Sequence, residues 1–142
     1  MIDLYTWHTP NGRKVSIMLE EIGIPYEVHS INIAKDEQFQ PHFLNICPNN
    51  KIPAIVDRSN NNYALFESGA ILIYLAEKTG KLLNSNNKEE YYRTLEWLMF
   101  QMANVGPMFG QVHHFVKYNK CKSEYSETRY SIEAKRFYGV MD

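Results

Sequence analysis

The sequence of 142 residues contains only two cysteines, Cys47 and Cys121, which form neither a C-x-x-C pair nor a spacing typical of metal ligands. A dithiol redox site and a cysteine-based zinc site are therefore not expected. No apolar run reaches the length of about 18 residues that a membrane-spanning helix needs. With 15 Lys and Arg against 16 Asp and Glu, no basic excess points to a nucleic-acid partner. The N-terminal residues lack the features of a signal peptide, so we expect a protein of the reducing cytoplasm.

The residues that are present predict an α/β unit at the start of the chain. A hydrophobic content of 44% is enough to fill a core. Apolar spacing and turn residues predict four strands, at 2–5, 26–33, 54–57 and 63–66. The same signals predict two long helices, at 11–22 and 68–79, and a short helix between them at 41–47. The resulting order, βαβ then ββα, is that of a mixed four-stranded sheet with helices packed on it.

Beyond a polar linker at 81–87 the pattern is helical only. Apolar residues recur at helical spacing from Lys88, Pro107 is expected to kink or restart the helix, and a last helix is predicted at 126–140. We therefore expect two domains, 1–83 and 88–142. The second reads as an incomplete all-helical domain.

The stretch K-I-P-A-I-V, from Lys51 to Val56, places Pro53 directly before a predicted strand. A trans-proline is tolerated at a strand start, and a cis-proline is the alternative. A cis bond would turn the backbone of Ile52 outward, where it could pair with an extended peptide. The residues alone leave both readings open.

Two predicted helix starts could each be a plain cap or a binding site. Ser68 in L-F-E-S-G-A can cap its helix, but the free N–H groups there also suit a ligand carboxylate, and Glu67 could accept from a ligand ammonium. In T-P-N-G, Thr9 can cap the first helix. The Thr9 hydroxyl, the Asn11 amide and the free N–H groups near Gly12 would equally suit an anion such as a thiolate.

Other reactive residues favour ordinary structural roles. His113 and His114 are adjacent, so they point about 100° apart on a helix, and no nearby residue completes a metal site. We therefore expect no bound metal. Cys47 is more typical of a small buried apolar side chain than of a reactive thiol.

Taken together, these motifs resemble the glutathione transferase superfamily, and the resemblance covers essentially the whole chain. It is carried by T-P-N-G, by Q-F-x-P-x-F at 38–43, by P-N-N-K-I-P-A-I-V at 48–56 and by L-F-E-S-G-A-I-L-x-Y-L-A-E-K-T-G at 65–80. G-P-M-F-G-Q-x-H-H-F at 106–115 continues it. The set is most similar to the nu-class (YfcG-type) group of glutathione-dependent disulfide-bond oxidoreductases.

The resemblance implies a thioredoxin-like first domain with Pro53 as a cis-proline, and glutathione as cosubstrate with no metal. Its implied partners are a small-molecule or protein disulfide and a second copy of the chain in a homodimer. Thr9 and Asn11 would face the glutathione sulfur and act in catalysis. The residues implied to bind glutathione are Asn11, Gln38, Lys51, Ile52, Pro53, Glu67, Ser68 and Arg129.

The chain departs from this family because family members continue beyond Asp142. The surface that their further helices cover, on Leu95, Leu98, Phe109 or Phe137, is then expected to be exposed. A truncated glutathione-binding remnant or interaction module is one alternative function. Conjugation of electrophiles is another, and it would need Tyr5 as the thiolate-stabilising residue, although Tyr5 lies within the first predicted strand.

Overall fold

A mixed four-stranded sheet forms the first part of the chain, with its strands in the order β2-β1-β3-β4. β1 pairs with β2 in parallel and with β3 in antiparallel, and β4 runs antiparallel to β3. The strands span Ile2–Thr6 (β1), Tyr26–Ser30 (β2), Ala54–Asp57 (β3) and Tyr63–Phe66 (β4). The computed structural model describes residues 1–142, which fall into two compact units, 1–91 and 92–142.

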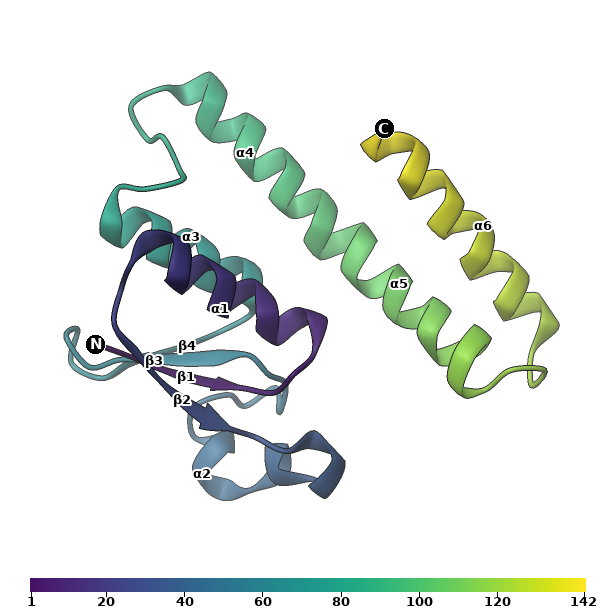
Figure 1. The fold of residues 1–142 in the computed structure, drawn as a ribbon, viewed down its shortest axis with the longest axis horizontal. Helices are drawn as coiled ribbons and strands as arrows, with labels where there is room; N and C mark the ends of the chain where they lie inside the picture. Colours follow the sequence, from purple (N-terminus) through teal and green to yellow (C-terminus); the bar gives the residue numbers. More distant parts are fainter. The chain divides into compact units, whose positions relative to one another are not determined.

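Two long helices, α1 (Pro10–Ile22) and α3 (Ser68–Thr79), pack side by side on one face of the sheet, and the short α2 (Pro41–Leu44) lies on the other (Figure 1). Both long helices end at a glycine in the left-handed conformation, Gly23 with φ 75° and Gly80 with φ 66°. The predicted thioredoxin-like fold of this unit, followed by a helical region, is confirmed.

The sheet buries side chains on both faces because they alternate along each strand. Ile2 and Leu4 of β1 are fully buried on the side of α1 and α3. On the opposite side the ring of Tyr5 lies 6.3 Å from that of Phe43 in α2. This second cluster includes the buried Cys47, so the prediction of a small buried apolar side chain there is confirmed.

Asp57, at the end of β3, is a fully buried carboxylate that ties the sheet to α3. It accepts hydrogen bonds from the Tyr74 hydroxyl at 2.6 Å and from the Ser59 backbone and hydroxyl at 2.9 and 2.7 Å. The Lys78 ammonium lies 2.8 Å from it. Burial alone would raise the pKa of Asp57, but these hydrogen bonds hold it well below its ordinary value.

Three sequence predictions are wrong in this unit. The short helix α2 ends at Leu44 and not at Cys47. The second strand ends at Ser30 and not at Ile33, because the Asn32 side chain accepts from the Ala34 amide and starts a 3-10 turn. Ser68 does not cap α3: it is the first helical residue, and Glu67 holds the capping position without a side-chain capping bond. A second 3-10 turn, Glu37–Phe39, precedes α2.

The second unit consists of helices alone. Helix α4 (Lys88–Phe100) leads through a π-helical segment, Gln101–Val105, into α5 (Gly106–Val112), and a second π-helical segment follows at His113–Tyr118. As expected, the α-helix restarts at Pro107: α5 begins at Gly106 with Pro107 in its first turn, and the π-helical segment before it keeps the chain helical. Helix α6 (Glu124–Met141) is capped by Ser123, whose hydroxyl accepts from the Ser126 amide.

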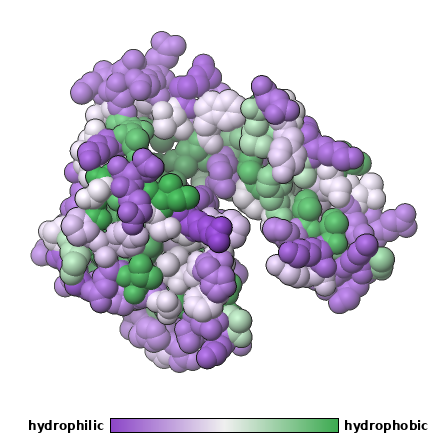
Figure 2. Space-filling model, viewed as in Figure 1, coloured by the Kyte–Doolittle hydropathy of each residue, from purple (hydrophilic) through white to green (hydrophobic).

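Phe137 of α6 is fully buried, so its predicted exposure is wrong. Its ring meets that of Phe100 edge-on at 5.7 Å and lies 6.3 Å from that of Phe109. Leu95, Leu98 and Phe109 are half-buried. Large apolar side chains elsewhere on this unit remain exposed, Trp97 and Ile132 among them, and Figure 2 shows hydrophobic residues at its surface between hydrophilic ones. No helix in the structure has the length and apolarity to span a membrane.

Candidate functional site

Strand register brings three of the predicted segments to the same end of the sheet. Tyr5 of β1 pairs with Ala54 of β3, and Ala54 pairs in turn with Phe66 of β4. The T-P-N-G turn follows β1, cis-Pro53 precedes β3, and Glu67 follows β4. Because paired strands lie about 4.8 Å apart, these three segments leave the sheet next to one another. β2 runs parallel to β1 and ends there too, so the chain towards Gln38 starts from this same end.

Thr9 caps α1, as predicted. Its hydroxyl oxygen accepts from the Gly12 amide at 3.2 Å, and its carbonyl accepts from the Arg13 amide at 3.1 Å. Pro10 occupies the first helical position, where a missing N–H costs nothing. The first turn of α1 has no acidic side chain, so no carboxylate offsets its positive end.

Asn11 and Gly12 in this turn differ sharply in their surroundings. The Asn11 side chain is exposed at the N-terminus of α1. Gly12 is buried, and a Cβ there would lie 2.3 Å from Thr6 Oγ1 and 2.4 Å from the Trp7 carbonyl oxygen. Only glycine permits this close approach of α1 to the end of β1. Gly12 therefore fixes the position of the turn that carries Thr9 and Asn11.

The Ile52–Pro53 peptide bond is cis, as the resemblance implies. Pro53 is buried, Ile52 is half-buried and the Lys51 side chain is exposed. The Cys47 thiol donates to the Lys51 carbonyl oxygen at 3.2 Å. Cys47 thus contributes to the shape of the loop before Pro53 while its sulfur stays away from solvent.

Glu67, at the capping position of α3, has a φ of 71°, a conformation uncommon for residues other than glycine. Its carboxylate accepts from the Asn49 side-chain amide at 3.3 Å. Burial lowers the pKa of Lys14 on α1, and the Glu67 charge raises it in part, so the two charges attract each other. Ser68 is buried beside Glu67. The sequence analysis did not single out Asn49, although it belongs to the quoted motif P-N-N-K.

Gln38 lies in the 3-10 turn before α2 and is half-buried. Its side-chain amide donates to Asp36 at 3.5 Å, whereas its carbonyl oxygen is buried and no donor of the chain reaches it. A buried acceptor without a donor is unfavourable.

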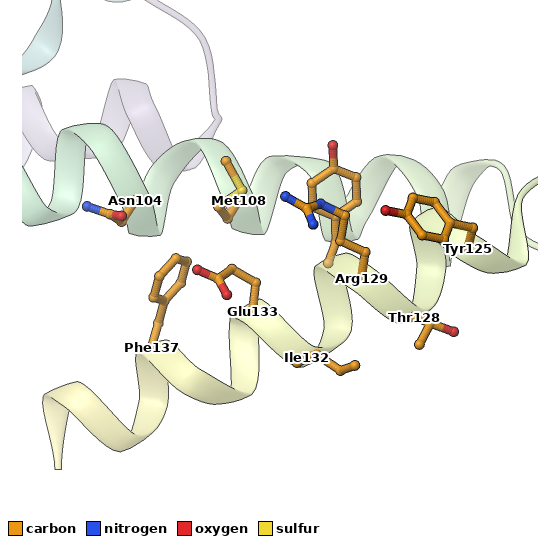
Figure 3. A pocket seen from close by; sticks show the side chains of 9 residues that line it. Asn104, Met108, Tyr125, Thr128, Arg129, Ile132, Glu133 and Phe137 are labelled. Atoms are coloured by element: carbon orange, nitrogen blue, oxygen red, sulfur yellow. The ribbon is translucent and has the colours of Figure 1, made fainter.

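Arg129 lies in the helical unit, on α6, where it lines a pocket of about 470 Å³ between α5 and α6. Its guanidinium extends toward α5, close to Met108, and Glu133 points in the same direction (Figure 3). The complete lining is Asn104, Met108, Tyr125, Thr128, Arg129, Tyr130, Ile132, Glu133 and Phe137. The pocket thus combines a cation and hydroxyl groups with apolar surface.

One cluster of possible metal ligands, which the sequence analysis did not find, is an ion-pair network. Ligand atoms of Asp3, Glu27 and His29 lie within 4.8 Å of one another. The Arg58 guanidinium donates to both Asp3 and Glu27, and its hydrogen bond lowers the pKa of Asp3. The Arg58 guanidinium thus already occupies oxygens of both carboxylates, which are held in ion pairs.

Tyr5 is unsuited to stabilising a thiolate. Its ring is stacked on that of His29 at 4.7 Å, and the side chain is only partly accessible. Burial raises the pKa of its phenol, and the charge of Asp3 raises it further. The geometry thus does not favour Tyr5 in the role that the conjugation alternative assigns to it.

Comparison with known proteins yields one family and several close relatives. Residues 1–77 match the family model of the glutathione S-transferase N-terminal domain. The chain is 47% identical to the disulfide-bond oxidoreductase YfcG of Escherichia coli over 146 aligned positions, which cover all of this chain and 67% of that protein.

The fold of the chain is also similar to that of two solved structures. A glutathione transferase family member from Pseudomonas fluorescens, with two glutathione molecules bound, is 53% identical with a TM-score of 0.93. A glutathione transferase from Pseudomonas putida, with glutathione disulfide bound, is 49% identical with a TM-score of 0.91. The alignments cover 98% and 99% of this chain but 63% of each relative. The chain thus spans about two thirds of the length of these proteins.

Proposed function

This chain belongs to the glutathione S-transferase family, and on that basis we propose that it binds glutathione and uses it to reduce disulfide bonds. The observation that carries the proposal is the strand register, which gathers Thr9, Pro53 and Glu67 at one end of the sheet. The only cysteine of that unit, Cys47, is buried. The binding of glutathione and glutathione disulfide by the Pseudomonas relatives supports the same ligand here.

We propose that residues 1–83 form the glutathione-binding domain and hold the tripeptide at its two ends. The backbone of Ile52 would pair with the cysteinyl residue. Glu67 would accept from the γ-glutamyl ammonium, and Ser68 at the start of α3 would meet its carboxylate. Gln38, which is half-buried in the turn before α2, would reach the backbone of the ligand. Lys51 is exposed and would contribute positive charge beside the anionic tripeptide.

The sulfur would then lie at the T-P-N-G turn. A thiol with a pKa of about 8.5 is only about 3% thiolate at pH 7, and lowering that pKa to about 6.5 needs roughly 2.7 kcal/mol. The helix dipole of α1 supplies about 0.3–1 kcal/mol. Hydrogen bonds to the charged sulfur, at about 1.5–3 kcal/mol each, would supply the rest. The Thr9 hydroxyl and the Asn11 amide are the donors in this proposal.

The reaction would proceed by two thiol–disulfide exchanges. The bound glutathione thiolate attacks one sulfur of the substrate disulfide, forms a mixed disulfide and releases one substrate thiolate, which takes a proton from water. A second glutathione thiolate attacks the glutathione sulfur of that mixed disulfide and releases the other substrate thiolate. Two glutathione molecules are oxidised to glutathione disulfide, and one substrate disulfide is reduced to two thiols.

Arg129, in the helical unit, is the remaining residue that the resemblance implies to bind glutathione. Its guanidinium can bind a carboxylate of glutathione or of the substrate by two parallel hydrogen bonds. Charge reversal, Arg129→Glu, should therefore raise the KM for an anionic disulfide more than that for a neutral one.

The proposal is tested by a glutathione-coupled disulfide reductase assay on protein of this length, with its mass in solution measured alongside. We expect turnover of a small disulfide such as hydroxyethyl disulfide, and a homodimer. The free state of both cysteines is consistent with action in the reducing cytoplasm. Retention on glutathione resin without turnover would favour a binding module, and faster conjugation of a chlorinated nitroaromatic would favour a transferase.

A further inference from the structure

Asn49 lies outside the predicted site residues but contacts one of them. Its side-chain nitrogen Nδ2 donates to Glu67 Oε1 at 3.3 Å. Asn49 belongs to the loop that leads to cis-Pro53, whereas Glu67 immediately precedes α3. The hydrogen bond therefore joins two segments at the end of the sheet where the candidate site lies.

The Glu67 side chain needs such a partner to keep one orientation. It is exposed, and an exposed glutamate otherwise samples many rotamers. It makes no capping bond to its own helix, so its carboxylate is directed toward the loop of Asn49 rather than toward the N-terminus of α3. Its second oxygen, Oε2, is not the acceptor in that bond and is the atom that would accept from a ligand.

The chemistry of Asn49 suits this role. An amide donates a hydrogen bond without carrying a charge, so it orients the Glu67 carboxylate without adding a second cation to that of Lys14. A lysine or arginine in the same place would neutralise the carboxylate charge and weaken its attraction for a ligand ammonium.

We propose that Asn49 is a positioning residue that holds the Glu67 carboxylate for the α-ammonium group of the ligand. Selection for a free ammonium then depends on Asn49 as well as on Glu67. This inference rests on the proposed function, because it takes the ligand to be glutathione.

The test compares two ligands by isothermal titration calorimetry: glutathione, and N-glutaryl-cysteinylglycine, which is glutathione without its α-ammonium. Asn49→Ala should weaken glutathione binding about fivefold, the effect of one ordinary hydrogen bond, and should leave binding of the analogue unchanged. Asn49→Leu, which keeps the side-chain size and removes the donor, should have the same two effects as Asn49→Ala. Asn45→Ala, at an exposed asparagine after α2, is the matched control and should change neither affinity.

A double variant sharpens the test. In a Glu67→Ala background, Asn49→Ala should have no further effect on glutathione binding, because the group that it positions is gone. Equal weakening of both ligands by Asn49→Ala, an unchanged affinity for glutathione, or full additivity in the double variant would overturn the proposal. Failure of the unmodified protein to bind either ligand would instead remove the proposed function itself.

Discussion

The hydroxyl oxygen of Thr9 accepts a hydrogen bond from the backbone N–H of Gly12 at 3.2 Å. This bond uses one acceptor site, and a threonine hydroxyl also carries one O–H donor. The Thr9 proton can therefore be directed at a ligand sulfur while the oxygen caps α1. Helix capping and thiolate binding, which the sequence presents as alternatives, are compatible in one side chain.

Thr9→Asp should separate these two roles. Aspartate caps helices well and favours their positive end, so stability should stay within about 1 kcal/mol of the unmodified protein. The aspartate carboxylate cannot donate a hydrogen bond to a thiolate at pH 7. One hydrogen bond to a charged group is worth about 1.5–3 kcal/mol, so its loss predicts a fall in kcat/KM of roughly ten- to hundredfold. Thr9→Ser keeps the hydroxyl and is the control. Thermal melts and the reductase assay measure both effects, and full activity in Thr9→Asp would contradict the role of the hydroxyl.

Asn11→Ala should impair the chemistry and leave the fold intact. The side chain is exposed, and alanine is the better helix former, so no loss of stability is expected. Removal of one donor to the sulfur should raise the pKa of bound glutathione by about one to two units, as read from the pH dependence of kcat. An unchanged pH profile with unchanged activity would rule out a sulfur contact for Asn11.

Gly12→Ala should disturb the turn through a steric clash. The added Cβ would lie 2.4 Å from the Trp7 carbonyl oxygen, which belongs to the backbone and cannot rotate away. We expect a loss of about 1–3 kcal/mol, the usual cost of overpacking, together with weaker glutathione binding. Gly110→Ala in α5 is the matched control: its Cβ meets nothing within 4 Å, so it should gain about 0.5–1 kcal/mol. Similar effects of the two changes in denaturant melts would contradict this reading of Gly12.

The predictable parts of the fold are those with a strong local signal. Helix α1 follows from apolar residues at helical spacing between a threonine cap and Gly23, and its observed bounds differ from the predicted ones by one residue. The hairpin of β3 and β4 follows from two short apolar runs around an asparagine-rich turn. In each case the local preference and the tertiary structure agree.

The errors arise where a local choice depends on distant contacts. Ile33 has a high β propensity, but the Asn32 side chain and the Glu37 carboxylate take over the backbone N–H groups there and end the strand. Phe137 is buried because the aromatic rings of Phe100 in α4 and Phe109 in α5 pack on it. The bond from Asn49 to Glu67 spans 18 residues, and no periodic pattern in the sequence reports it.

Acid should weaken the fold through Asp57. Its folded pKa lies below the unfolded value of about 3.9, so the unfolded chain takes up a proton first as the pH falls, and stability is lost below about pH 5. Asp57→Asn should cost about 2–3 kcal/mol at pH 7 and reduce the difference in unfolding free energy between pH 7 and pH 3. Glu77→Gln, at an exposed position of α3, is the control and should keep the full difference. Identical pH dependence in Asp57→Asn would refute the role of this carboxylate.

The claim that ligand thiols supply both redox sulfurs is tested most directly with a variant that has no cysteine. Cys47→Ser/Cys121→Ser keeps a donor for the Lys51 carbonyl and changes an exposed side chain at the second position. Its glutathione-dependent reduction of hydroxyethyl disulfide is compared with that of the unmodified protein, with folding checked by circular dichroism. We predict the same kcat/KM within about a factor of two, less than the effect of one lost hydrogen bond. A folded variant without activity, beside an active unmodified protein, would show that a protein cysteine is the redox sulfur and would contradict the proposed mechanism.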